Sequence, residues 1–230
     1  MVKKLIANMM FPLLGKLRKA SLQKIISRFS KRKDDIFFIQ IGSNDGVTRD
    51  PLHRHITKDQ WRGIVVEPVR YIYEKLIENY RYYPRVSCEN LAIADENGTR
   101  EFYRLKESDD GLPEWYDQIG SFNPDIVETH SHKINNFYKY YITEQVDCIT
   151  LETLLKRHNV QKIDLIHIDT EGYDHEIIKM INFDKFNPEI IMFEHKHLPI
   201  ETYKEVIHFL KEKHYKLYSE KNDTMAILRG

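Results

Sequence analysis

Five short apolar runs in the sequence are each followed directly by acids, amides or glycines. Because runs of this kind are typical of buried strands in a parallel sheet, their carboxyl ends would meet at one edge. Ligands of such sheets bind outside that edge. The stability of the sheet does not require acids, amides and glycines at all of these strand ends, so the pattern predicts a ligand-binding site. The groups that would meet are Gly42–Gly46, Glu67–Pro68, Asn90–Ala92, Asp169–Gly172 and Glu194–His195.

The loop Gly42–Gly46 and the acid Glu67 indicate what kind of ligand this site would hold. An acid at the tip of the second strand of a strand-helix-strand unit can accept hydrogen bonds from both hydroxyls of a ribose. The loop has two glycines and carries Asp45, whereas a loop that cradles a diphosphate has three glycines and leads directly into a helix. An acid repels a diphosphate but suits an amino group and a positively charged sulfonium. Together these features predict an adenosine-containing ligand.

Strand and helix patterns alternate from residue 36 onward, which predicts an α/β fold with a parallel, doubly wound sheet. Asp50 and Pro51 have the residue types of a helix N-cap and a first helical position. His167 lies in the middle of an apolar strand and is expected to be a core residue. The last two patterns, 215–220 and 224–229, predict a hairpin. The other strand patterns occupy residues 36–42, 63–68, 86–95, 99–105, 163–172 and 189–195.

The composition is that of one globular domain without a general preference for nucleic acid. A chain of 230 residues can bury one sizeable core, and its formal net charge is zero. Cys88 and Cys148 each lie in an apolar, strand-like run, as expected of free thiols in a reducing, cytoplasmic compartment. Residues 105–143 are polar, irregular and rich in aromatic side chains. This favours an insertion or a lid that either contacts carbohydrate rings or packs onto the domain.

Residues 1–33 are expected to form a basic helical arm ahead of an acidic domain over residues 34–230. The arm contains ten Lys and Arg residues and no acid. Apolar residues recur at helical spacing on both sides of a break at Pro12 and Gly15. Two alternatives follow. The arm packs on the domain or covers its pocket, or it binds the inner face of an anionic membrane. Its apolar run is far shorter than the ~20 residues that span a bilayer.

Several motifs, taken in order, resemble the FkbM-type S-adenosylmethionine-dependent methyltransferases. They are "FIQIGSNDG", "VVEP", "NLAIAD", "IDLIHIDTEGYDHEII" and "IIMFEH", and the resemblance covers about residues 36–228. It implies a Rossmann-like, mostly parallel sheet of seven strands with an antiparallel hairpin at its end. It also implies that S-adenosylmethionine is the cofactor and that a hydroxyl of a sugar, glycan or natural product is methylated.

The resemblance also implies roles for the residues at the strand ends. The loop from Gly42 would hold the methionine and adenosine parts, and Glu67 would hold the ribose. The adenine would lie beside Asn90 and Ala92, and the acids that follow the fourth inner strand would lie between cofactor and acceptor. The segment "VTRDPLHR" departs from the family's first loop, which leaves open which loop atoms hold the methionine part. The predicted cofactor-binding residues are Gly42, Ser43, Asn44, Asp45, Gly46, Glu67, Pro68, Asn90, Ala92, Asp169 and Glu171.

A sugar hydroxyl needs a base, and the predicted edge offers His195, Asp169 and Glu194 as catalytic residues. His195 is the first choice because its reference pKa lies near neutrality, although a histidine at a strand end can equally act as a cap. Glu194 could orient His195 or the acceptor. His195 and His197 would point the same way in an extended chain, and with Asp169 they would suit a divalent ion. No further ligand is evident, so no metal site is predicted.

Two other classes of function fit parts of the pattern. A nicotinamide-dependent oxidoreductase would use the same ribose acid, but the missing third glycine and the loop acid Asp45 count against it. A non-catalytic adenosine-binding or membrane-adaptor protein would share the fold. The acids at all the predicted strand tips argue against such a loss of catalysis.

Overall fold

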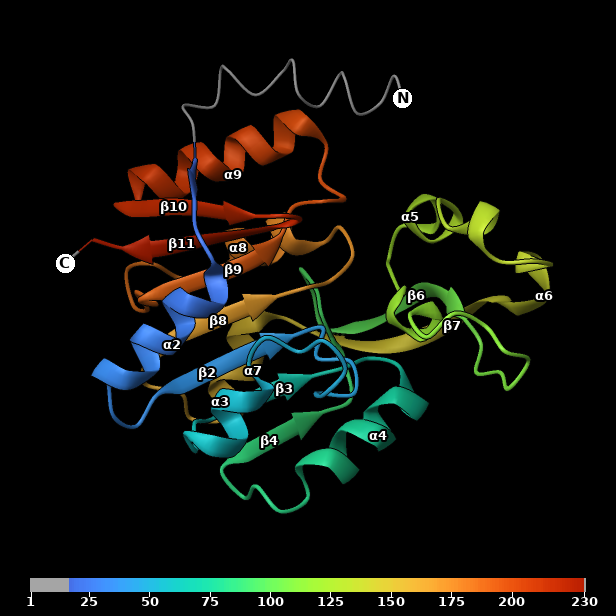
Figure 1. Cartoon of the computed structure of the whole chain (residues 1–230), viewed down its shortest axis with the longest axis horizontal. Coiled ribbons are helices and arrows are strands. Elements are labelled where there is room, and N and C mark those ends of the chain that lie inside the picture. The colour runs from blue at the N-terminus through green and yellow to red at the C-terminus, as the bar shows by residue number, and fades with distance from the viewer. Residues whose placement is uncertain (1–16, 230) are drawn as a thin grey trace.

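The computed structural model describes residues 17–229, in which a central sheet forms the core of a doubly wound α/β fold (Figure 1). Five strands run parallel, and their carboxyl ends point toward one edge. Continuous apolar sequence forms these strands because both faces of the sheet are covered. In spatial order the five are β9 (Ile190–Glu194), β8 (Leu165–Ile168), β2 (Phe37–Ile41), β3 (Arg62–Val66) and β4 (Val86–Glu89).

Three further strands extend the sheet beyond β9. Strand β11 (Asp223–Leu228) pairs antiparallel with β9, and β10 (Tyr215–Glu220) pairs antiparallel with β11. The two-residue strand β1 (Arg18–Lys19) lies outside β10 and brings the described sheet to eight strands, one more than expected. Both side chains of β1 are exposed, so this strand has no alternating pattern from which it could be predicted.

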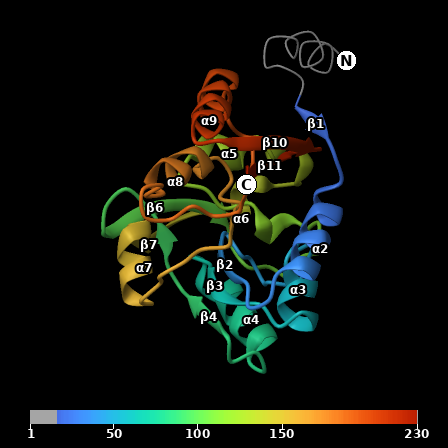
Figure 2. The same cartoon turned by 90° about the vertical axis from the view of Figure 1, so that its left-hand side faces the viewer.

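Helices cover both faces of the sheet (Figure 2). One face is covered by α2 (Leu22–Arg32), α3 (His53–Lys58) and α4 (Arg70–Tyr80), which pack on side chains such as Phe38 and Val65. The opposite face is covered by α7 (Leu151–Arg157), α8 (Asp174–Met180) and α9 (Ile200–Glu212), which pack on Ile39 and Ile166. Successive side chains of a strand point to opposite faces of the sheet, so they pack alternately into two separate apolar cores.

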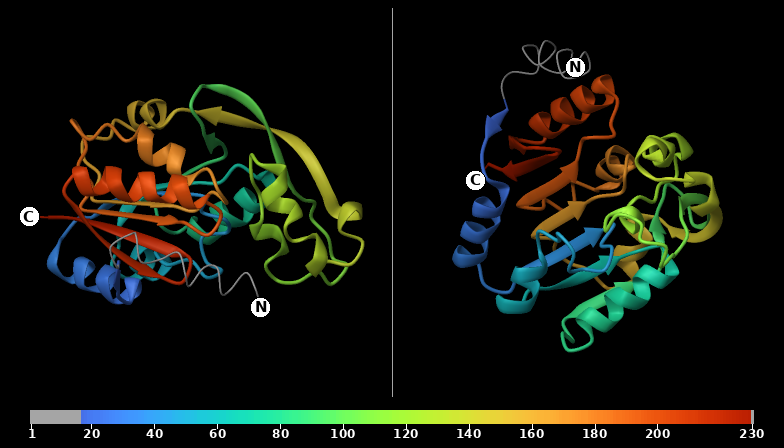
Figure 3. Two further views of the ribbon diagram at one scale, coloured as in Figure 1. Left: turned by 90° about the horizontal axis from the view of Figure 1, so that it is seen from above. Right: turned by 45° about the vertical axis from the view of Figure 1, so that its right-hand side comes forward.

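A second, three-stranded sheet carries the insertion. Strand β7 (Tyr141–Ile149) pairs with β5 (Ala92–Ile93) and β6 (Gly98–Leu105), and β6 and β7 extend well past the main sheet (Figure 3). Between them lie η2 (Tyr116–Gln118), α5 (Pro124–Glu128), η3 (Ser131–Lys133) and α6 (Phe137–Tyr140). The segment expected to be irregular therefore contains short helices and an apolar cluster of its own, which includes Leu105, Val127 and Phe137.

Helix α2 shows how the second half of the basic arm is placed. Its apolar residues Leu22, Ile26 and Phe29 are buried in the core that contains Phe38 and Val65. Glu220 accepts a hydrogen bond from the Leu22 amide at 2.9 Å. The helix therefore packs on the domain, and it could not insert this apolar face into a bilayer without leaving the core. The apolar residues of the first half lie outside the described residues.

The basic side chains of α2 lie on its other face. Lys24, Arg28 and Lys31 are exposed, while Lys33, just after the helix, pairs with the buried Asp164 at 2.7 Å. Across residues 17–229, no helix combines the length and apolar character needed to cross a membrane. Contact between residues 1–33 and an anionic membrane stays a prediction.

We expect Phe29→Ala to destabilise the whole domain. The ring is 2% exposed and packs edge-on against Trp61, so its removal leaves a cavity in the core and should lower the free energy of unfolding by about 3–5 kcal/mol. Chemical denaturation would measure the change, with Lys24→Ala on the exposed face as the matched control. A loss below about 1 kcal/mol would show that α2 is a detachable arm.

Candidate active site

A cavity of about 450 Å³ opens at the carboxyl edge of the inner strands. Its walls come mainly from the loop after β2, the ends of β3, β8 and β9, residues 91–93, and the insertion between β6 and β7. The position is the one expected for a ligand of an open α/β sheet. Figure 3 shows the insertion lying beyond this edge of the sheet.

The loop after β2 is held tightly against the neighbouring strands. Gly42 has φ +79°, and a Cβ atom there would lie 1.7 Å from the carbonyl oxygen of Asp169. The amides of Gly42 and Ser43 both donate to the Val66 carbonyl at 3.0 Å. Glycine is therefore required at position 42 both by backbone conformation and by space. Gly42, Ser43 and Asn44 line the cavity as expected.

Asp45 and Gly46 shape the loop and do not line the cavity. The carboxylate of Asp45 accepts hydrogen bonds from the amides of Val47 and Thr48 at 2.9 and 2.7 Å. A Cβ on Gly46 would lie 2.4 Å from the Tyr80 ring, so this glycine permits packing on α4. The expectation that Asp45 faces the ligand was wrong, because its side chain closes a local turn.

Asp50 is the acid of this loop that faces the cavity. One carboxylate oxygen accepts from the amides of Leu52 and His53, and the other accepts from Gln40 Nε2 at 3.2 Å. Burial raises the pKa of Asp50 to about 6. The sequence predicted only a helix cap at this position. The side chain does bind the amides that precede α3, but the helix begins at His53, later than Pro51 suggested.

Glu67 joins the first loop to the end of β3. Its two carboxylate oxygens accept from the amides of Asn44 at 3.0 Å and Val69 at 2.9 Å. Burial raises its pKa to about 7, against the lowering effect of these amides. Glu67 and Pro68 line the cavity. The position fits the predicted ribose ligand, since each oxygen retains a free lone pair.

The wall beside Glu67 is apolar. It consists of Leu91, Ala92 and Ile93, which all line the cavity. Asn90, predicted to contact the ligand, does not line the cavity. Its side-chain amide donates to the carbonyls of Glu67 and Pro68 at 2.9 Å. Asn90 therefore positions the ends of the strands, while Ala92 faces the cavity as expected.

Two polar side chains in the inner strands reach the cavity and were missed as site residues. Gln40 and His167 are paired neighbours on β2 and β8, both are buried, and both line the cavity. Gln40 Oε1 and His167 Nδ1 have no hydrogen-bond partner within residues 17–229, and burial lowers the pKa of His167 to about 4. His167 is buried in the core as predicted, but its ring is not satisfied by the described part of the protein as a core histidine would be. A lone polar residue in each of two adjacent apolar strands was the available signal.

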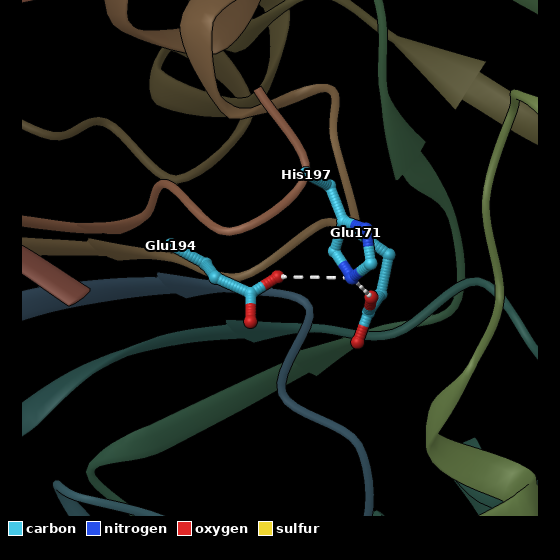
Figure 4. Close-up of side chains that lie close together, drawn as sticks. All are labelled: Glu171, Glu194 and His197. Atoms are coloured by element: carbon cyan, nitrogen blue, oxygen red, sulfur yellow. Dashed lines mark ion pairs between the residues drawn. The ribbon is translucent and has the colours of Figure 1, made fainter. Parts of the chain in front are cut away.

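Acids gather on the opposite wall, at the ends of β8 and β9. Asp169, Glu171 and Glu194 all line the cavity. The pKa of Asp169 is raised well above its ordinary value by burial, then by the nearby carboxylates of Glu194 and Glu171. Burial and Glu171 likewise raise the pKa of Glu194 to about 8. His197 joins this group, with Nε2 at 2.7 Å from Glu171 Oε2 (Figure 4).

His195 does not belong to the cavity lining. Its ring stacks on Tyr203 with centroids 4.7 Å apart, and its Nδ1 lies 3.0 Å from Thr224 Oγ1. Burial lowers its pKa to about 4. The expectation that His195 acts as the base is not supported. The chain turns directly after Glu194, so the side chains of His195 and His197 do not share a direction and the predicted pair does not form.

The insertion supplies the remaining wall. Ser121 ties it to the sheet edge, because its hydroxyl donates to the Glu171 carbonyl at 2.7 Å. The aromatic residues of the insertion have different surroundings. Trp115 and Phe122 line the cavity, whereas Phe137 and Tyr140 are buried within the insertion. The other insertion residues that line the cavity are Asp117, Gln118, Ile119, Gly120, His130 and Lys133.

Comparison with solved structures finds chains of similar fold. The chain is similar to a methyltransferase FkbM from Methylobacillus flagellatus KT, with a TM-score of 0.51 and 11% identity, over 84% of this chain and 44% of that protein. It is also similar to a precorrin-6y C5,15-methyltransferase from Geobacter metallireducens GS-15, with a TM-score of 0.46 and 11% identity, over 92% of each chain. A further match is the N-terminal domain of human METTL16 in complex with SAH. The TM-score is 0.45 and the identity is 10%, over 94% of this chain and 73% of that chain.

No curated protein sequence matches the chain. A family model described as the methyltransferase FkbM domain matches residues 40–217. This segment contains the first loop, Glu67, the acidic wall and the insertion, and the match does not support the nicotinamide-dependent alternative. The chain therefore belongs to the FkbM methyltransferase family and is an S-adenosylmethionine-dependent methyltransferase.

Proposed function

We propose that the protein transfers a methyl group from S-adenosylmethionine to a hydroxyl of a sugar, glycan or hydroxylated natural product. The observation that carries this proposal is the division of one cavity into two chemically different halves. One half has the first loop, Glu67 and an apolar wall, and the other has carboxylates and aromatic side chains. The first half suits a nucleoside and the second suits a polyhydroxylated acceptor.

The residues of the first half fit the cofactor. Leu91 and Ile93 would contact the flat faces of adenine, and Glu67 would accept hydrogen bonds from the ribose hydroxyls. The unpartnered atoms Gln40 Oε1 and His167 Nδ1 are buried polar groups that a ligand could satisfy. Bound S-adenosylmethionine would supply an electrophilic methyl group on a sulfonium, and that positive charge would favour the ionised forms of Asp50 and Asp169.

The second half supports an acceptor with several hydroxyls. Glu171 and Glu194 offer carboxylate oxygens to hydroxyl donors, and Trp115 and Phe122 offer aromatic surface to the carbon–hydrogen faces of a ring. Asp169 lies between the two halves, next to Gly42. We assign Asp169 as the group that accepts the hydroxyl proton while the acceptor oxygen takes the methyl group. Its raised pKa, caused by burial and neighbouring acids, makes it a stronger base than an ordinary aspartate.

The test of this function is a screen for methyl transfer. The full chain is mixed with S-adenosylmethionine and panels of sugars, nucleotide sugars, glycolipids and hydroxylated natural products, and S-adenosylhomocysteine formation is measured. We expect turnover with one hydroxylated class and a product methylated on oxygen. Transfer only to amines or thiols would contradict the proposal.

Glu67→Gln should weaken S-adenosylhomocysteine binding by ~1.5–3 kcal/mol, because a charge-assisted hydrogen bond to the ribose is lost. Calorimetry would measure the affinity. Glu74→Gln, at an exposed position of α4, is the matched control and should leave the affinity unchanged. If Glu67→Gln and the control bind S-adenosylhomocysteine with equal affinity, Glu67 does not bind the ribose.

The affinity for S-adenosylhomocysteine should rise with pH through about 7. The ribose hydroxyls bind the ionised form of Glu67, whose pKa in the ligand-free protein is about 7, so binding must first remove its proton at lower pH. The affinity should be about ten-fold weaker at pH 6 than at pH 8, and it should stay constant above pH 8. Glu67→Gln should flatten the profile, and a wild-type profile identical to that of the variant would contradict the assignment.

Asp169→Asn should lower kcat by ~10²–10⁴-fold, because the amide cannot accept the hydroxyl proton. Affinity for S-adenosylhomocysteine, measured by calorimetry, should change much less than kcat. His195→Gln serves as the comparison and should retain most of the turnover, since His195 is not part of the cavity. The reverse result, with His195→Gln inactive and Asp169→Asn active, would restore the histidine as the base.

A further inference from the structure

Three side chains on the acidic wall converge on one point, namely Glu171, Glu194 and His197 (Figure 4). His197 Nε2 lies 2.7 Å from Glu171 Oε2 and 3.8 Å from Glu194 Oε2. One ligand atom from each residue lies within 4.8 Å of the others. Atoms bound to one ion at about 2.0–2.2 Å are themselves separated by about 3–4 Å. Small side-chain adjustments would therefore bring all three into one coordination sphere.

The three atoms are buried, and their short contacts are with one another. Glu194 is 9% exposed, and the side chains of Glu171 and His197 are 15% and 10% exposed. Glu171 Oε2 and His197 Nε2 form an ion pair at 2.7 Å. Within the part of the chain that the structure describes, Glu194 Oε2 has no hydrogen-bond partner. Buried polar atoms of this kind are rare, and an unseen ion is one of their ordinary explanations.

The charges around this point favour a cation. Asp169 lies on the same wall and interacts with Glu171 and Glu194, so the acids outnumber the bases. Lys196 is the nearest ammonium, but its Nζ lies 4.0 Å from each of the two glutamates and is partly exposed. From the insertion, His130 approaches with its ring centroid 6.2 Å from that of His197. Neither side chain reaches hydrogen-bond distance of the two carboxylates.

We propose that Glu171, Glu194 and His197 bind a divalent transition-metal ion such as Mn²⁺ or Zn²⁺. Two carboxylate oxygens and one imidazole nitrogen suit these ions, whereas Mg²⁺ prefers oxygen ligands throughout. Three protein ligands leave coordination positions open, and Glu171 and Glu194 line the cavity. The open positions therefore face the space assigned to the acceptor.

The role of the ion rests on the proposed function. An acceptor hydroxyl bound to the ion would have a lower pKa. Its proton passes to Asp169, the oxygen–methyl bond forms, and the sulfur–methyl bond breaks with its electron pair remaining on sulfur. The metal would thus hold the acceptor oxygen, and Asp169 is not one of the three residues that would bind it.

The test is metal binding by the full chain, without any acceptor. Chelator-treated protein is titrated with Mn²⁺, and bound ion is measured from the loss of the free-ion electron paramagnetic resonance signal. We expect one Mn²⁺ per chain, displaced by equimolar Zn²⁺ but not by equimolar Mg²⁺. Glu171→Gln, Glu194→Gln and His197→Gln should each weaken binding at least ten-fold.

Matched controls lie on the exposed surface of α9. Glu201→Gln and His208→Gln remove the same chemical groups at positions that do not line the cavity, and Mn²⁺ affinity should not change. Lys196→Gln should tighten Mn²⁺ binding, because it removes the ammonium nearest the site. Calorimetry with S-adenosylhomocysteine on every variant shows that the cofactor half is intact.

Two results would overturn the metal site. The first is the absence of stoichiometric Mn²⁺ and Zn²⁺ binding by the wild-type chain, which needs no variant to fold. The second is metal binding that all three ligand variants retain. With S-adenosylhomocysteine affinity intact, either result removes the metal and leaves the proposed methyl transfer standing. A wild-type chain that binds metal but no S-adenosylhomocysteine would instead contradict the proposed function.

Discussion

The close approach of Gly42 to Asp169 is the constraint on which the site depends. The backbones of the first loop and of the segment after β8 meet so closely that a Cβ on Gly42 would lie 1.7 Å from the Asp169 carbonyl. Because β2 and β8 are adjacent parallel strands, this contact occurs at their carboxyl ends. It places the loop of the cofactor half directly beside the first acid of the acceptor half. Any side chain at position 42 would separate the two halves and widen the distance over which the methyl group must move.

The site also contains several buried acidic side chains. Burial raises the pKa of Asp50 to about 6 and that of Glu67 to about 7. As the pH rises, the unfolded chain releases these protons first, so the folded state loses stability between each unfolded pKa and the corresponding folded pKa. A protein selected for stability alone would avoid such groups. Their presence at one edge is understandable if bound cations and hydrogen-bond donors offset this loss in the working enzyme.

The sequence was sufficient to predict most of the fold and half of the site. Alternation of continuous apolar runs with helical patterns determines a parallel sheet, and the position of Glu67 follows because it ends the second run. The incorrect predictions for individual side chains of the site have a common cause. Asp45 and Asp50 lie in one loop, and only the path of that loop decides which acid turns inward. Likewise, the turn after Glu194 sends His195 toward Tyr203, and strand periodicity contains no information about where a strand ends in a turn.

The insertion explains why the acceptor half was harder to predict than the cofactor half. Its walls depend on contacts between segments distant in sequence, such as the Ser121 hydroxyl on the Glu171 carbonyl and the approach of Gly120 to the Phe102 ring. The cofactor half is built from strand ends whose positions the sheet determines, whereas the acceptor half depends on how β6 and β7 carry their insertion back over that edge. Changes confined to residues 105–143 could therefore alter the acceptor while leaving Gly42, Glu67 and Asp169 in place. The physical basis of acceptor choice thus lies in the packing of the insertion, and that of cofactor choice lies in the sheet.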